Sequence, residues 1–92
     1  MEAESLYERT LQIREQQLGS AHPDTATSLN NLAYLYQNQR KYVEAESLYE
    51  RTLQIREQQL GSEHPDTVAT LNNLAKLQYS REKYVEAEHL HT

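Results

Sequence analysis

The chain has 92 residues, of which 37% are hydrophobic and 25% charged, and its formal net charge at pH 7 is -5. This length allows one small domain, and the acidic balance argues against a nucleic-acid backbone or an anionic membrane as partner. The sequence contains no cysteine, which excludes disulfides and thiolate metal sites. No charged segment followed by an apolar one opens the chain, so a cleaved secretion signal is unsupported and a cytoplasmic location is expected.

The sequence repeats itself with a period of 42 residues. Residues 2–43 align with residues 44–85, and 32 of the 42 aligned pairs are identical. A third unit begins at Glu86 and stops at Thr92. We therefore predict one repeat array over residues 1–92, with full units at 2–43 and 44–85 and a partial unit at 86–92.

Apolar residues recur at helical spacing within each unit, as at Leu29, Leu32 and Tyr36. Gly61 suits the end of one helix and Pro65 the first position of the next, and the preceding unit repeats both signals. The pattern predicts five helices, at residues 3–18, 24–39, 43–60, 66–81 and 85–90.

A period of 42 equals six heptads, but the glycine and proline in every unit exclude one continuous coiled coil. Antiparallel helix pairs stacked side by side bury the apolar stripes instead, which gives an all-α fold. The residues predicted to fill the core between the helices are Leu32, Ala33, Tyr42, Ala45, Leu48, Tyr49 and Leu74.

The run LNNLAYLYQNQRKYVEAESLYERTL, residues 29–53, resembles a tetratricopeptide repeat. The intervening IREQQLGSEHPDT makes the unit longer, and the result is similar to the 42-residue variety found in kinesin light chains. The resemblance implies a right-handed α-solenoid. Where the family often has glycine before the second helix, this chain has Arg40 and Glu82, so we expect a turn there without a residue that favours positive φ.

No constellation for catalysis, cofactors or metals is visible, and the chain is not expected to be an enzyme. The carboxylates occupy polar helix positions, and the nucleophile-elbow, phosphate-loop and HExxH motifs are absent from the sequence. His22-Pro23-Asp24 and its copy resemble the tripeptide of J-domain co-chaperones. A helix start explains them better, because proline suits the first helical position and aspartate complements the positive helix end.

The resemblance implies that the first helix of each unit lines a concave groove that binds a short peptide. Asparagine can donate to and accept from a peptide backbone, and tyrosine adds flat apolar area. Because Lys76 is the only ionised residue on these stripes, an aromatic or mildly acidic peptide is favoured, and tight recognition of a C-terminal carboxylate is not. Alternatively, this polar stripe is an ordinary solvent-exposed helix face that binds no ligand. The groove residues predicted in this way are Thr27, Asn30, Asn31, Tyr34, Asn38, Asn72, Asn73, Lys76, Tyr79 and Ser80.

Two functional hypotheses follow, neither of which identifies a partner. In the first, the chain is a protein-interaction scaffold that binds a peptide or protein ligand. In the second, it is a fragment or engineered excerpt with a structural role, which stacks end to end on itself or exchanges helices with a second copy. The faces expected to be open for such stacking comprise Leu6, Leu11 and Ile13 at the start and Leu71 or Leu77 near the end.

Overall fold

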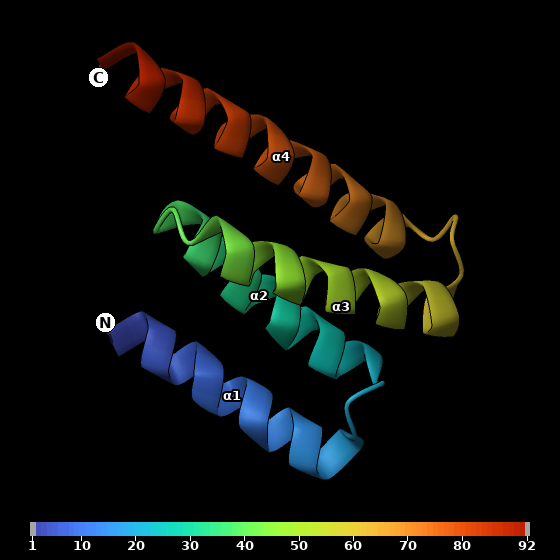
Figure 1. Ribbon diagram of the computed structural model, residues 1–92. Helices are drawn as coiled ribbons and strands as arrows, with labels where there is room; N and C mark the ends of the chain where they lie inside the picture. Colours follow the sequence, from blue (N-terminus) through green and yellow to red (C-terminus); the bar gives the residue numbers. More distant parts are fainter. Residues whose placement is uncertain (1, 92) are drawn as a thin grey trace.

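The computed structural model describes the backbone of residues 2–91 and the side chains of residues 3–83 and 85. Consecutive helices run antiparallel (Figure 1). Helix α2 packs against both α1 and α3, and α3 also packs against α4. The predicted all-α repeat solenoid is confirmed. The four helices of the described backbone are α1 (Glu2–Leu18), α2 (Pro23–Asn38), α3 (Tyr42–Leu60) and α4 (Pro65–His91).

The turn from α3 to α4 is held by local hydrogen bonds. Gly61 follows α3 with φ 93°, a left-handed value that favours glycine. The Thr67 hydroxyl donates to the Gly61 carbonyl at 2.8 Å, and the Asp66 amide donates to Nδ1 of His64 at 3.1 Å. The turn from α1 to α2 repeats these bonds, with Pro23 in the first turn of α2. The helix-start interpretation of the His-Pro-Asp tripeptides is confirmed, and histidine itself supplies the cap.

An arginine near the end of each odd-numbered helix is bonded to the helix that follows. The Arg56 side chain is buried and donates to the Asp66 carbonyl at 3.3 Å and to the Thr70 hydroxyl at 2.8 Å. Burial lowers the pKa of Arg56, and the nearby Asp66 partly opposes that shift. The guanidinium stays charged because its ordinary pKa is so high. Arg14 makes the same two bonds to α2, so the two copies of this contact fix both helix pairs.

The core consists of two adjoining clusters on either side of the α2–α3 contact. Four of the predicted core residues are buried, namely Leu32, Ala33, Ala45 and Tyr49. The other three, Tyr42, Leu48 and Leu74, are half-buried and pack against the clusters. The full membership is Leu11, Ala26, Leu29, Leu32 and Ile55 in one cluster and Ala33, Ala45, Tyr49 and Leu77 in the other.

The predicted break between residues 81 and 85 is wrong, because α4 continues as one helix to His91. In the preceding unit Arg40 makes the turn with φ 63°. Its strain is offset there because α3 then folds back and buries Ala45 and Tyr49. Glu82 occupies the equivalent position inside α4, where the backbone stays helical. Continuing the helix satisfies the backbone without strain, so no separate fifth helix forms at residues 85–90.

Two residues expected on open stacking faces are instead buried. Leu11 is 9% exposed and lies in the core cluster with Leu29 and Leu32 of α2. Leu77 is 1% exposed and packs with Tyr49 of α3. Both leucines therefore point toward the neighbouring helix within the chain. Leu6, Ile13 and Leu71 are exposed as predicted.

Equivalent alanines in the two units provide a matched test of the core. Ala33 is fully buried beside Ala45 and Tyr49, whereas Ala75, 42 residues later, is exposed. We predict that Ala33→Leu overpacks the α2–α3 contact and lowers the free energy of unfolding by about 1–3 kcal/mol. Ala75→Leu should change it by less than about 0.5 kcal/mol. Urea denaturation measures both, and equal effects would contradict the packing described.

Tyr49 predicts a loss of stability at alkaline pH. Its hydroxyl donates to Oε1 of Gln37 at 3.0 Å, and burial, with a smaller contribution from Tyr34, raises the pKa of Tyr49 from 10.0 to about 12. The unfolded chain therefore ionises first, and this stabilising contribution is complete below pH 10 and lost as the pH rises through 12. In Tyr49→Phe the fall of the unfolding free energy over this range should be shallower. An equally steep fall in urea titrations would show that Tyr49 is not responsible.

Candidate functional site

The predicted groove residues lie on two helices, and we call them the asparagine face. The structure brings the two rows together at one pair, since Nδ2 of Asn73 on α4 donates to Oδ1 of Asn30 on α2 at 3.3 Å. Both members of the pair are half-buried. The α2 row comprises Thr27, Asn30, Asn31, Tyr34 and Asn38, and the α4 row comprises Asn72, Asn73, Lys76, Tyr79 and Ser80.

Most of the asparagine face is open to solvent. Tyr34 is 59% exposed and Tyr79 63% exposed, so each row presents one aromatic ring. The Thr27 hydroxyl is already used, because it donates to the Pro23 carbonyl at 3.2 Å. Ser80 is half-buried, whereas Asn31, Asn38, Asn72 and Lys76 are exposed.

A further cation joins this face because α4 is continuous. Lys76, Tyr79 and Lys83 are spaced three and four residues apart, which places them on one side of the helix. Nζ of Lys83 lies 5.6 Å from the centre of the Tyr79 ring. Sequence reasoning missed Lys83 because it placed the end of the helix at residue 81. With Lys83 included, the α4 row carries two positive charges beside an exposed aromatic ring.

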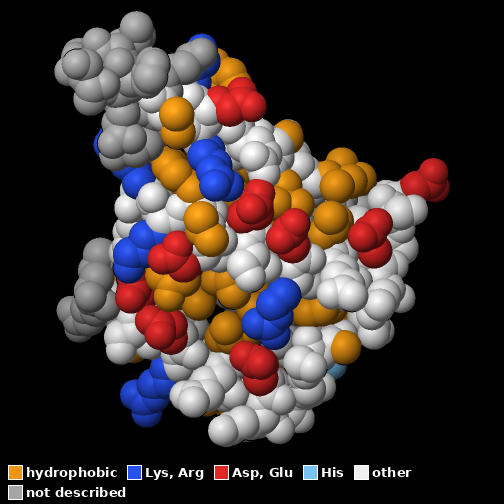
Figure 2. Space-filling model, in the orientation of Figure 1, with side chains coloured by type: hydrophobic (Ala, Val, Ile, Leu, Met, Phe, Trp, Pro, Cys, Tyr) orange, Lys and Arg blue, Asp and Glu red, His pale blue; other side chains and the backbone are white. Residues whose placement is uncertain are grey.

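A second surface, which sequence reasoning missed, is a hollow of about 820 Å³ between α1 and α3, here called the α1–α3 groove. Figure 2 looks onto this side of the molecule and shows apolar side chains gathered in the hollow, with acidic and basic ones around it. None of the predicted groove residues contributes to it. Its lining comes from α1 (Ser5, Glu8, Arg9, Leu11, Gln12, Glu15), α2 (Leu32, Tyr36) and α3 (Val43, Glu44, Ser47, Leu48).

The electrostatics of the α1–α3 groove centre on Tyr36 at its base. Burial raises the pKa of Tyr36, and the carboxylates of Glu8, Glu4 and Glu44 add to the rise. Lys41 supplies one compensating charge, since its Nζ lies 3.6 Å from Oε1 of Glu4 and 5.4 Å from the centre of the Tyr36 ring. The base of this groove is therefore aromatic and its surroundings carry excess negative charge.

The described part of the chain contains no cluster of three or more acidic or histidine side chains placed to hold a metal ion. Within the same residues, no helix has the length and apolar character needed to cross a membrane. The described residues thus offer two candidate binding surfaces, one with asparagine, tyrosine and lysine and the other with leucine, tyrosine and glutamate.

Comparison with known families agrees with the repeat architecture. The family model for the tetratricopeptide repeat matches residues 1–57 and, in a second register, residues 26–92. A comparison with curated protein sequences finds no match to this chain. Repeats of the matched family generally mediate protein–protein interactions and form non-catalytic scaffolds. With the whole length covered by the two matches, the chain belongs to the tetratricopeptide repeat family.

Proposed function

We propose that the chain is a protein-interaction scaffold whose asparagine face binds a short extended peptide. The observation that carries the proposal is the combination of exposed Tyr34 and Tyr79 with the Asn30–Asn73 bond between the rows. The rings offer flat contact area, and the exposed amides beside them can pair with a peptide backbone along its length. Such pairing is the kind of polar contact that fixes the orientation of a bound peptide.

The charges of α4 favour an acidic ligand. Lys76 is exposed, and Lys83 lies over the Tyr79 ring. A carboxylate and an aromatic side chain close together in a peptide would match this arrangement, because lysine pairs with carboxylates and tyrosine stacks on other rings. A basic peptide would meet like charge.

Two fluorescein-labelled probes test this proposal. Acetyl-Glu-Tyr-Asp-Trp-amide should bind more tightly than the same peptide with lysine in place of both acidic residues. Lys76→Ala and Asn73→Ala should each weaken binding of the acidic probe by about three- to tenfold in anisotropy titrations. Gln58→Ala on α3, outside the face, serves as the control. Equal affinity for the two probes, or no effect of either variant, would contradict the proposal.

The second candidate function is self-stacking, and identical residues with different burial favour it. Residues 2–18 have the same sequence as residues 44–60. Tyr49 on α3 is fully buried between α2 and α4, whereas its copy Tyr7 on α1 is 40% exposed. Likewise Ile55 is 7% exposed and its copy Ile13 44%. Helix α1 therefore exposes residues whose copies on α3 are buried in the contact with α2.

Helix α4 presents the complementary face. Leu29 and Ala26 of α2 are fully buried, whereas their equivalents Leu71 and Val68 are 48% and 51% exposed. A second copy could therefore place its α1 on this α4 as α3 lies on α2. The contact is head to tail and can propagate, and exchange of identical helices is a related route.

For self-stacking, we predict a weight-average mass that rises with concentration in sedimentation equilibrium. Ile13→Glu and Leu71→Glu should each suppress the rise, because a charge would be buried without a partner in the contact. Gln58→Glu adds the same charge on an exposed part of α3 and should leave the rise unchanged. A monomer mass at all concentrations would exclude this second function.

Two finer assignments belong to the proposal as well. The 42-residue period supports membership of the variety found in kinesin light chains. A cytoplasmic location stays a prediction from the sequence.

A further inference from the structure

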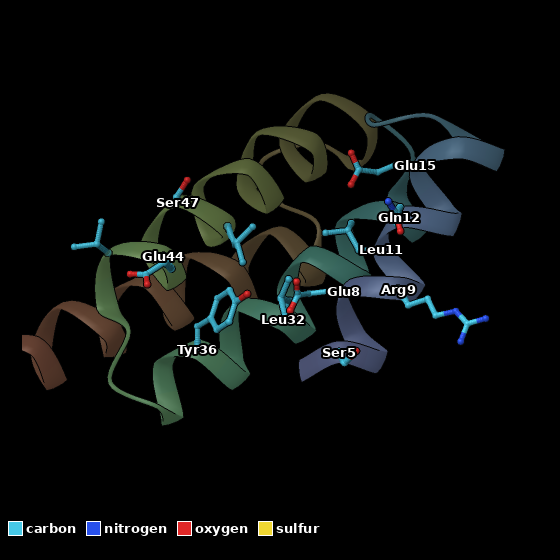
Figure 3. A pocket seen from close by; sticks show the side chains of 12 residues that line it. Ser5, Glu8, Arg9, Leu11, Gln12, Glu15, Leu32, Tyr36, Glu44 and Ser47 are labelled. Carbon is cyan, nitrogen blue, oxygen red and sulfur yellow. The ribbon is translucent and has the colours of Figure 1, made fainter. Parts of the chain in front are cut away.

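The α1–α3 groove lies between α1 and α3, whereas the asparagine face is built from α2 and α4. Its base is apolar, with Leu11 and Leu32 buried and Leu48 half-buried. In Figure 3 the Tyr36 ring lies beside Leu32, with Glu8 and Glu44 on opposite sides of it. The groove therefore combines an apolar strip with an aromatic ring between two carboxylates.

Two carboxylates near Tyr36 have a negative charge that no ion pair neutralises. Glu4 is paired with Lys41, and Oε2 of Glu15 lies 3.7 Å from Nη2 of Arg51. Among the described residues, neither Glu8 nor Glu44 has an ion-pair partner within 4.0 Å. Arg9 is the one cation in the lining, and its guanidinium points away from Tyr36 (Figure 3). The raised pKa of Tyr36, due to burial and then to Glu8, Glu4 and Glu44, is the response expected of a phenol in this negative field.

We propose that the α1–α3 groove binds a basic–aliphatic peptide segment, with an arginine over Tyr36 between Glu8 and Glu44 and with leucine-type side chains on the apolar strip. Arginine suits the position because its planar guanidinium stacks on an aromatic ring and bonds to carboxylates on either side. Nζ of Lys41 lies 5.4 Å from the centre of the Tyr36 ring, so one cation of this chain already lies close to the ring. The leucines supply the apolar burial that an exposed ion pair alone lacks.

The charge of the groove selects this occupant over others. An acidic peptide or a nucleic acid would meet the glutamates and be repelled. The apolar faces through which a second copy can stack, on α1 and α4, are centred on Ile13 and Leu71, and neither residue lines the groove. This preference is opposite to that of the asparagine face, so one chain can hold a basic and an acidic segment at the same time.

The chain contains its own negative control. The copy of Tyr36 is Gln78, which donates to Oε2 of Glu46, and Arg81 pairs with the same carboxylate at 3.7 Å. Helix α4 then continues to His91 and does not turn back beside α3. Among the described residues, Glu50, the copy of Glu8, therefore has the same local sequence but faces neither a copy of Tyr36 nor a helix that turns back as α3 does.

Anisotropy titration with fluorescein-labelled acetyl-Leu-Ala-Arg-Leu-Ala-amide tests the inference. The double variant Glu8→Gln/Glu44→Gln should weaken binding about tenfold, and the loss should be smaller at high salt, where the wild type also binds less. Tyr36→Gln, which introduces the residue present at position 78, should weaken it similarly. Glu50→Gln and Lys76→Ala should leave the affinity unchanged, and the second of these separates this groove from the asparagine face.

Several outcomes would overturn the inference. One is a probe with glutamate in place of arginine that binds as tightly. A second is an affinity that Glu8→Gln/Glu44→Gln does not alter while circular dichroism shows an unchanged fold. Absence of binding at millimolar probe is a third. If the double variant instead changes the sedimentation mass of the chain alone, the occupant is a second copy and the peptide assignment is wrong.

Discussion

The arginine that bonds each odd-numbered helix to the helix after it makes the contact on which the stack depends. Arg56 is only 8% exposed and has two acceptors on α4, a backbone carbonyl and the Thr70 hydroxyl. A buried charge is tolerated only where such bonds replace its hydration, so the position of α4 against α3 is set by where these acceptors lie. Arg14 imposes the same relation on α1 and α2. The glycine, histidine and threonine of each turn then connect helices whose relative position is already fixed.

With the helices placed in this way, the molecule has two different surfaces, the α1–α3 groove and the asparagine face. Helices α1 and α3 share one sequence and both line the α1–α3 groove, whereas α2 and α4 share most of another sequence and meet at the Asn30–Asn73 bond. The glutamates of the first sequence gather around Tyr36, and the asparagines of the second meet at Asn30 and Asn73. The opposite charge preferences proposed for the two surfaces depend on positions that differ between the units, since Tyr36 is replaced by Gln78 and Tyr34 by Lys76. These preferences do not require a dedicated insertion or loop.

Much of the fold could be predicted because its determinants are local. Gly61 and Pro65 mark a turn whose φ value and helix start the structure confirms, and apolar spacing identified Ala33, Ala45 and Tyr49 as core. The continuation of α4 could not be predicted in this way. Residues 80–84 contain neither glycine nor proline, and neither do residues 38–42, where the chain turns, so the local sequence does not distinguish a turn from a continuous helix. The α1–α3 groove was missed for a related reason, since its lining comes from three helices and has no signature in any one of them.

On the asparagine face the positions were predictable from periodicity, but Lys83 required knowledge of the uninterrupted helix.

The two units also show how far an identical sequence determines a local environment. Tyr7 and Tyr49 have the same neighbours in sequence, yet one is 40% exposed and the other fully buried, because only the second has a helix on each side. Conversely, the ten positions that differ between the units include five consecutive ones, residues 78–82 of the second unit, together with Lys76 nearby. In this region the first unit has Tyr36, which lines the groove between α1 and α3. The second unit has the exposed Gln78, which is bonded to Glu46. An apolar ring at position 78 would gain little burial there, whereas glutamine keeps its hydrogen bond in water-exposed surroundings. The divergence is thus concentrated where the packing environments of the units differ, and the side chains that each surface exposes depend on which helices lie beside it.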